Sequence, residues 1–230
     1  MKHLLITGTL LTGLLLPYST ALKGNEISQE ELERWFNSDT MEPPRYKDVN
    51  EGHLVFLSEN RNPTLHHHHN SLTISPQSLS NGWIRLEQCH HNMDKVPAAQ
   101  ILFKEGRVKN IKITRQENIQ KAWVEGYSVQ MENITDNAVI CLQADTHSLL
   151  QNKDGTYSLR NGPYMRRFLD GYYPIRVSLD LNFSQTQLEL LDVSPPSQRG
   201  FEIVEMDKGL LHFDTVFEGK LQTEFHFRYR

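Results

Sequence analysis

The sequence predicts an exported, mainly β protein with an antiparallel β-sandwich-like architecture and a short N-terminal helix. Short apolar or alternating segments recur from residue 53 onward, and turn signals rich in Gly, Pro, Asn and Asp separate them. The chain starts with Lys2 and a 13-residue apolar stretch, Leu4–Leu16, which is typical of an export signal. The two cysteines, Cys89 and Cys141, both lie in the exported portion.

Residues 1–21 are the predicted signal peptide. The small residues Ser19, Thr20 and Ala21 favour cleavage after Ala21. The apolar stretch is shorter than the roughly 20 residues that a spanning helix needs, although an uncleaved anchor is the alternative. Signal removal would leave no predicted membrane span, so we expect a periplasmic or secreted protein.

Residues 22–45 are predicted to form a helix and a linker. Ser28 and Glu31 match a capping box, and Leu32, Trp35 and Phe36 share one helical face. We expect that face to dock onto the main domain or onto a partner. The sequence MEPPR at residues 41–45 then favours an extended linker.

Residues 46–150 are predicted to form a first β unit. The segment Ala138–Ala144 is apolar on both faces, which is typical of a buried central strand. The run Asp136–Cys141 is similar to the residues before the second cysteine of immunoglobulin-like domains, and this resemblance supports a sandwich. It covers six residues and has no tyrosine at the tyrosine-corner position, so we assign no family. The other expected strands are 53–57, 72–74, 83–89, the hairpin 100–115, and 122–131.

Residues 151–174 form a predicted turn-rich insert, and residues 175–230 form a second β unit. Three turn signals divide the insert, at residues 154–155, 161–163 and 170–171, and Tyr164–Asp170 is long enough for about two helical turns. Apolar residues alternate with polar ones near the C-terminus, which predicts a strand with one buried face. Whether the two β units form one domain or two stays open.

Cys89 and Cys141 are predicted to form a disulfide because the predicted compartment is oxidising. Closing the loop between them would stabilise the fold by roughly 4 kcal/mol in the chain-entropy description. Pairing requires the two Cα atoms to lie within about 7 Å. The alternative is that Cys89, which precedes two histidines, is a free thiolate ligand or nucleophile.

Six of the eleven histidines fall in two runs, His66–His69 and His90–His91. Imidazole is a common ligand of zinc and copper. Because side chains alternate along a strand, His66 and His68 are expected on the face of Leu72, while His67 and His69 point the other way. The alternative is a solvated run without a bound ion. The metal hypothesis, with zinc or copper as the possible cofactor, uses His66, His68, His90 and Cys89.

Arginines and aromatic residues gather in the insert. Guanidinium groups bind carboxylates or phosphates, and aromatic rings supply stacking area, so this segment is a candidate recognition surface. The alternative is a packed plug whose arginines pair with Asp154 or Asp170. The candidate binding residues are Arg160, Tyr164, Arg166, Arg167, Tyr172 and Tyr173.

The sequence contains no nucleophile elbow, phosphate loop or dinucleotide fingerprint, so no catalytic residue is assigned and an enzyme is not favoured. The formal net charge is -4, and interspersed charges form no basic patch for nucleic acid. We therefore expect a non-catalytic binding or scaffold protein of the periplasm or cell envelope, whose partner is a protein or an envelope ligand. The alternative function is an extracytoplasmic zinc- or copper-handling protein.

Overall fold

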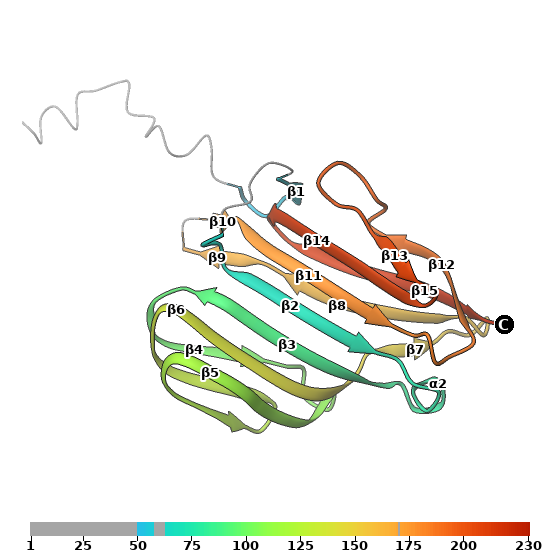
Figure 1. Ribbon diagram of the computed structural model, residues 1–230, viewed down its shortest axis with the longest axis horizontal. Helices are drawn as coiled ribbons and strands as arrows, with labels where there is room; N and C mark the ends of the chain where they lie inside the picture. The colour runs from blue at the N-terminus through green and yellow to red at the C-terminus, as the bar shows by residue number, and fades with distance from the viewer. Residues whose placement is uncertain (1–49, 58–62, 170) are drawn as a thin grey trace, which may run out of the picture. The chain divides into compact units, whose positions relative to one another are not determined.

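The computed structural model describes residues 50–57, 63–169 and 171–230 (Figure 1). The predicted signal peptide (1–21) and the predicted helix and linker (22–45) lie outside the described residues. The described chain is mainly β, as predicted, and residues Asp48–Arg230 form one compact unit. Its only described α-helix is the single turn α2 (Ser78–Asn81). No helix in this part of the chain has the length and apolarity needed to cross a membrane.

The largest sheet has nine strands, and most neighbouring strands are antiparallel. The parallel pair is β2 with β11, which places a strand from residues 175–230 next to one from residues 46–150. Two strands lie off the main path, because β13 pairs with β14 and β5 pairs with β6. In sheet order the main path is β1 (Val55–Phe56), β14 (Leu210–Glu218), β11 (Ile175–Asn182), β2 (His67–Thr73), β3 (Trp83–Met93), β6 (Ser128–His147) and β4 (Val96–Leu102), and the two others are β13 (Val204–Asp207) and β5 (Val108–Glu125).

A four-stranded antiparallel sheet forms the second layer, and a two-stranded hairpin lies beside the start of β2 (Figure 1). The second layer contains, in order, β12 (Leu188–Ser194), β15 (Leu221–Tyr229), β8 (Tyr157–Tyr164) and β7 (Leu149–Gln151). The hairpin consists of β9 (Arg166–Phe168) and β10 (Gly171–Tyr173). The strands expected in two successive β units therefore share the same sheets.

The segment predicted as a turn-rich insert contributes to the second sheet. Tyr157 and Leu159 on β8 are buried, and the strand pairs with both β7 and β15. The expected helical turns over 164–170 are wrong, because Arg166–Phe168 is a strand that pairs with Gly171–Tyr173. The turn signal at residues 154–155 lies between β7 and β8, whereas the signal at 161–163 lies inside β8, where the pairing with β15 shifts register.

The core lies between the two larger sheets and forms one continuous cluster. Alternation buries one face of each strand, as in Leu221, Phe225 and Phe227 on β15. Phe227 contacts Phe183, which follows β11, with ring centroids 5.1 Å apart. Burying a side chain of this size stabilises the fold by roughly 1.5–3 kcal/mol.

Asparagines bend the long β5–β6 hairpin. The register between β5 and β6 shifts three times, and left-handed backbone at asparagine accompanies two of these shifts, at Asn110 and at Asn118 with Asn137; Asn133 has the same conformation within regular pairing. Asparagine adopts this conformation more readily than most residues. β6 consequently pairs with β4 through its first half and with β3 through its second half.

Candidate functional site

Strand β2 divides the histidine run between the two faces of the large sheet, as the sequence alternation predicted. His68 lies opposite His90 on β3, and His67 lies opposite His91. His66 directly precedes β2. The inner face of β2 also carries Asn70, which is buried. We call His66, His68 and His90 the core histidines, and His67, His69 and His91 the outer histidines.

A hydrogen-bonded chain joins two of the core histidines to Gln88. The amide Nε2 of Gln88 lies 2.6 Å from Nε2 of His90, and Nδ1 of His90 lies 3.1 Å from Nε2 of His66. The Gln88 amide nitrogen can only donate, so Nε2 of His90 accepts. The proton of neutral His90 then sits on Nδ1 and is donated to His66. Both nitrogens of His90 are therefore occupied.

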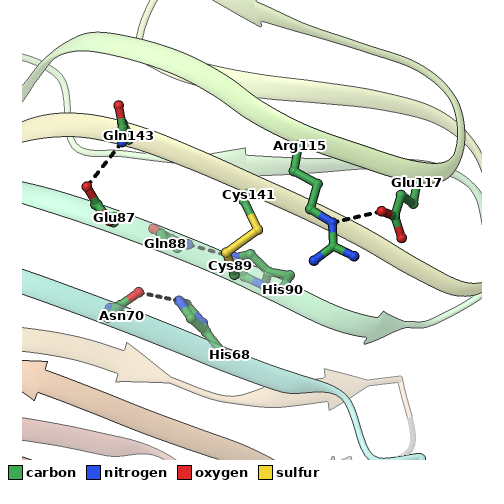
Figure 2. The surroundings of a disulfide bond; sticks show 10 residues. All are labelled: His68, Asn70, Glu87, Gln88, Cys89, His90, Arg115, Glu117, Cys141 and Gln143. Atoms are coloured by element: carbon green, nitrogen blue, oxygen red, sulfur yellow. Dashed lines mark hydrogen bonds and ion pairs between the residues drawn. A yellow bond between two sulfur atoms is a disulfide. The ribbon is translucent and has the colours of Figure 1, made fainter.

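The third core histidine connects the two sheets. Nε2 of His68 donates to Oδ1 of Asn70 over 2.9 Å, and Nδ2 of Asn70 donates to the Tyr164 hydroxyl on β8 over 2.5 Å (the first bond is drawn in Figure 2). The rings of His68 and His90 are tilted by 41° with centroids 4.1 Å apart, and His68 meets Tyr164 edge to face at 4.9 Å. The amide of Asn161 lies next to this network, and its Nδ2 is buried without a partner among the described residues.

Burial keeps the core histidines neutral. Desolvation lowers the pKa of His66 to about 4 and that of His68 to about 3, and it holds the pKa of His90 well below the ordinary value. Nearby imidazoles lower the pKa of His68 and His90 further. For His66, Asp94 opposes the shift and Arg166 adds to it. At neutral pH the cluster is therefore a network of uncharged hydrogen bonds.

The structure brings together three of the four residues of the metal hypothesis, but Cys89 faces away from them. Adjacent residues on a strand point to opposite faces, so Cys89 lies on the outer side and His90 on the inner side. Cys89 forms the predicted disulfide with Cys141, at a Cα–Cα distance of 4.1 Å (Figure 2). It is not available as a thiolate ligand or nucleophile. Among the described residues, no group of three or more His, Cys, Asp or Glu side chains is arranged to hold a metal ion.

The outer histidines lie on the half-exposed face of the large sheet. Asp180 on β11 accepts from His69 Nε2 at 2.6 Å and from His212 Nδ1 at 2.7 Å. Partial burial favours the neutral carboxyl, but these two hydrogen bonds and the histidine charges outweigh it and leave the pKa of Asp180 below its ordinary value. Nε2 of His69 and Nδ1 of His212 thus each donate to a different oxygen of the Asp180 carboxylate.

A serine and histidine pair on the same face has the spacing of a nucleophile and a base. Oγ of Ser178 lies 2.7 Å from Nε2 of His67. Acyl transfer also needs hydrogen-bond donors directed at the developing oxyanion. Ser178 lies inside β11, which pairs with β2 on one side and β14 on the other. The backbone amides around it therefore donate to neighbouring strands and are not directed at an oxyanion. Desolvation, reinforced by Arg176, also lowers the pKa of His67 to about 4, and we assign the pair no catalytic role.

Three of the six predicted binding residues lie outside any contact surface on the hairpin. Tyr164 and Tyr172 are buried, at 4% and 7% exposure. Burial also raises the pKa of Tyr164, so its hydroxyl stays protonated. Arg160 lies on the exposed face of β8 and pairs with Glu224 at 3.0 Å. Because Tyr164 and Tyr172 are buried and Arg160 is paired on the second sheet, the exposed residues of the hairpin remain as the candidate surface.

The β9–β10 hairpin carries the remaining three binding residues, Arg166, Arg167 and Tyr173. Arg166 binds Asp94 with two hydrogen bonds, Nε to Oδ2 at 3.0 Å and Nη2 to Oδ1 at 2.6 Å. Arg166 thus pairs with Asp94 and not with Asp154, and the pairing with Asp170 in the alternative interpretation lies outside the described residues. Arg167 is exposed, and its guanidinium lies 5.5 Å from the ring centre of Tyr172.

Comparison with known proteins adds no function to this geometry. No protein-family model matches the sequence, and no curated protein is significantly similar to it.

The sequence interpretation missed three polar residues that complete the site, and it missed the partner of a fourth, Asp94. Asn70 and Gln88 occupy positions of the alternating pattern where an apolar residue is expected, and this signal was available in the sequence. Asn161 belongs to a strand that was not predicted. Asp94 lies in the connection between β3 and β4, where no local pattern indicates its pairing with Arg166.

Proposed function

We propose that this protein is an exported, non-catalytic binding protein whose contact surface is the β9–β10 hairpin. The observation that carries the proposal is the exposure of apolar and cationic side chains on a hairpin with an anchored base. Phe168 is 40% exposed and Leu169 is fully exposed, while Arg166 is held by Asp94. Exposed apolar side chains gathered at one site are typical of interaction surfaces.

The export part of the proposal is supported by the signal-like N-terminal sequence and by the disulfide. Cys89 and Cys141 lie directly opposite each other on β3 and β6. Disulfides persist in oxidising compartments, which include the periplasm and the extracellular space. We therefore place the binding function in the cell envelope or outside the cell.

The chemistry of the hairpin favours an anionic, partly apolar ligand. Arg167 and Lys220 both lie over the ring of Tyr172, at 5.5 and 5.6 Å, so two exposed cations flank the base of the hairpin. Phe168, Leu169 and the 39% exposed Met165 supply the apolar part. This combination matches an anionic lipid surface, where each cation contributes about 1 kcal/mol and apolar side chains enter the headgroup region.

Co-sedimentation with lipid vesicles tests this function. At neutral pH the wild-type protein should bind phosphatidylcholine vesicles that contain phosphatidylglycerol and should bind pure phosphatidylcholine weakly. The double variant Arg167→Ala with Leu169→Ser should lose binding. A matched control, Val204→Ser with Met206→Ser, removes exposed apolar residues from β13 and should retain it. Equal binding by the wild type and the hairpin variant, or no binding by the wild type, would contradict the proposal.

A further inference from the structure

The core histidines lie next to the β8–β9 joint, which is the connection from Tyr164 to Arg166 that leads into the hairpin. Tyr164 is the last residue of β8, and one residue separates it from Arg166 at the start of β9. Tyr164 is held by Asn70 and contacts His68, while the charges of Asp94 and Arg166 both act on His66. The start of β2, the end of β3 and the β8–β9 joint therefore contribute side chains to one polar cluster; Figure 1 shows the strands that carry them.

We propose that this cluster is a pH-sensitive latch: the neutral core histidines hold the β8–β9 joint against the large sheet, and their protonation releases it. The latch regulates the hairpin to which the previous section assigns binding, so its biological role rests on that function. The opening itself is a property of the fold and can be measured without a ligand.

Protonation destroys the hydrogen-bond chain for a geometric reason. At neutral pH Nδ1 of His90 donates to Nε2 of His66 across 3.1 Å. Adding a proton to His66 places a hydrogen on Nε2, so two N–H groups then face each other. Adding a proton to His90 places one on Nε2, which faces the Gln88 amide donor. Either proton therefore replaces an attractive contact by a repulsive one.

Most of the groups that face the cluster do not stabilise a positive charge there. His66 faces Arg166 from β9 and His91 from β3, and His68 is influenced by the outer histidines of β2 and contacts Tyr164 of β8. His90 faces the other two core histidines and His91. Asp94 is the carboxylate acting on the cluster among the described residues, and two hydrogen bonds already bind it to Arg166.

This arrangement makes protonated His66 and Arg166 competitors for one carboxylate. If Asp94 turns toward a charged His66, it loses the bidentate contact that anchors the hairpin. If it stays with Arg166, the charge on His66 remains unpaired in a buried site, which is strongly unfavourable. Movement of the β8–β9 joint away from the large sheet relieves both problems, because it admits water to the cluster.

Amide hydrogen exchange read by mass spectrometry tests the latch on the full folded protein. Peptides covering residues 157–173 should exchange faster as pH falls, after correction for the intrinsic rate, and should exchange faster than peptides from β14 at each acidic pH, because β14 opens only through global unfolding. Well below the unfolded histidine pKa of about 6.5, each proton taken up on opening shifts the equilibrium by about tenfold per pH unit. An exposed histidine is only half protonated at pH 6.5, so a single-proton latch predicts about fivefold greater opening at pH 5.5 than at pH 6.5, and two protons predict about thirtyfold.

Two variants and one control identify the groups responsible. His66→Gln keeps a hydrogen-bonding side chain that does not titrate, so it should reduce the pH dependence by about one proton. Asp94→Asn weakens the anchor and should open the joint already at neutral pH. His226→Gln, on the second sheet beside Glu224, should behave as wild type. If His66→Gln does not fold, as judged by near-UV circular dichroism, the Asp94→Asn result decides.

The outcomes separate the latch from the proposed binding function. Protection of residues 157–173 that stays constant between about pH 7 and pH 5 would overturn the latch, even if vesicle binding succeeds. Acid-dependent exchange without vesicle binding would retain the latch and refute the function of the hairpin. Exchange of β14 and β8 at the same corrected rate would also overturn it, because that result indicates global unfolding.

Discussion

Acid should destabilise this protein well above the pH at which its carboxylates titrate, because the core histidines must be neutral in the folded state. The pKa of His66 falls from 6.5 to about 4 on folding, and that of His68 falls to about 3. The unfolded chain therefore binds more protons than the folded chain below about pH 6.5. The stabilisation is complete above that value and is lost as the pH falls toward the folded pKa values.

The size of the effect follows from linkage. At about pH 5 each of these two histidines favours the unfolded state by about 2 kcal/mol, and together they contribute about 4 kcal/mol. The shift of His90 acts in the same direction. A single domain is stable by only about 5–15 kcal/mol, so a large share of the folding free energy disappears between about pH 7 and pH 5.

Urea unfolding at a series of pH values measures this loss directly. The free energy of unfolding, obtained from the midpoint and the slope, should fall by about 4 kcal/mol or more from about pH 7 to pH 5. Replacing His68 by Asn should remove about 2 kcal/mol of that dependence, whereas His226→Gln should leave it unchanged. A free energy of unfolding that is constant over this range would refute the assignment of the core histidines as buried and neutral.

Three further predictions concern the disulfide, the buried network and metal ions. Replacing both Cys89 and Cys141 by Ala, which opens a sequence separation of 52 residues, should lower the free energy of unfolding by about 4 kcal/mol in urea. Tyr164→Phe removes one acceptor from Asn70 and should cost about 1 kcal/mol by the same assay. Protein purified without a histidine tag should contain sub-stoichiometric zinc and copper by mass spectrometry, and dialysis against a chelator should leave its melting temperature unchanged.

Local patterns in the sequence were sufficient to predict the mainly β class, the disulfide, and which histidines of the run share a face of the sheet. Alternation depends only on the backbone of one strand, so the shared face of His66 and His68 followed as soon as β2 was recognised. The two cysteines had one possible intramolecular partner each. These predictions needed no knowledge of which strands lie side by side.

The remaining architecture depends on contacts between distant parts of the chain. Pairing of β2 with β11 brings His67 to Ser178, 111 residues away, and no local signal specifies that neighbour. Strand β8 was missed because Asn161 interrupts its apolar face, and the short hairpin after it lacks a clear periodicity. The pairing of Asp94 with Arg166 was missed because it depends on the arrangement of both sheets.

The position of the disulfide indicates which side of the cluster opens in acid. Cys89 immediately precedes His90, and its bond to Cys141 ties β3 to β6 at that point of the ladder. On the other side, β2 is hydrogen-bonded along its length to both β3 and β11. The strand β8, by contrast, is joined to the cluster through side chains, chiefly the Tyr164 contact with Asn70. Charge within the cluster should therefore displace the β8 side and leave the large sheet intact.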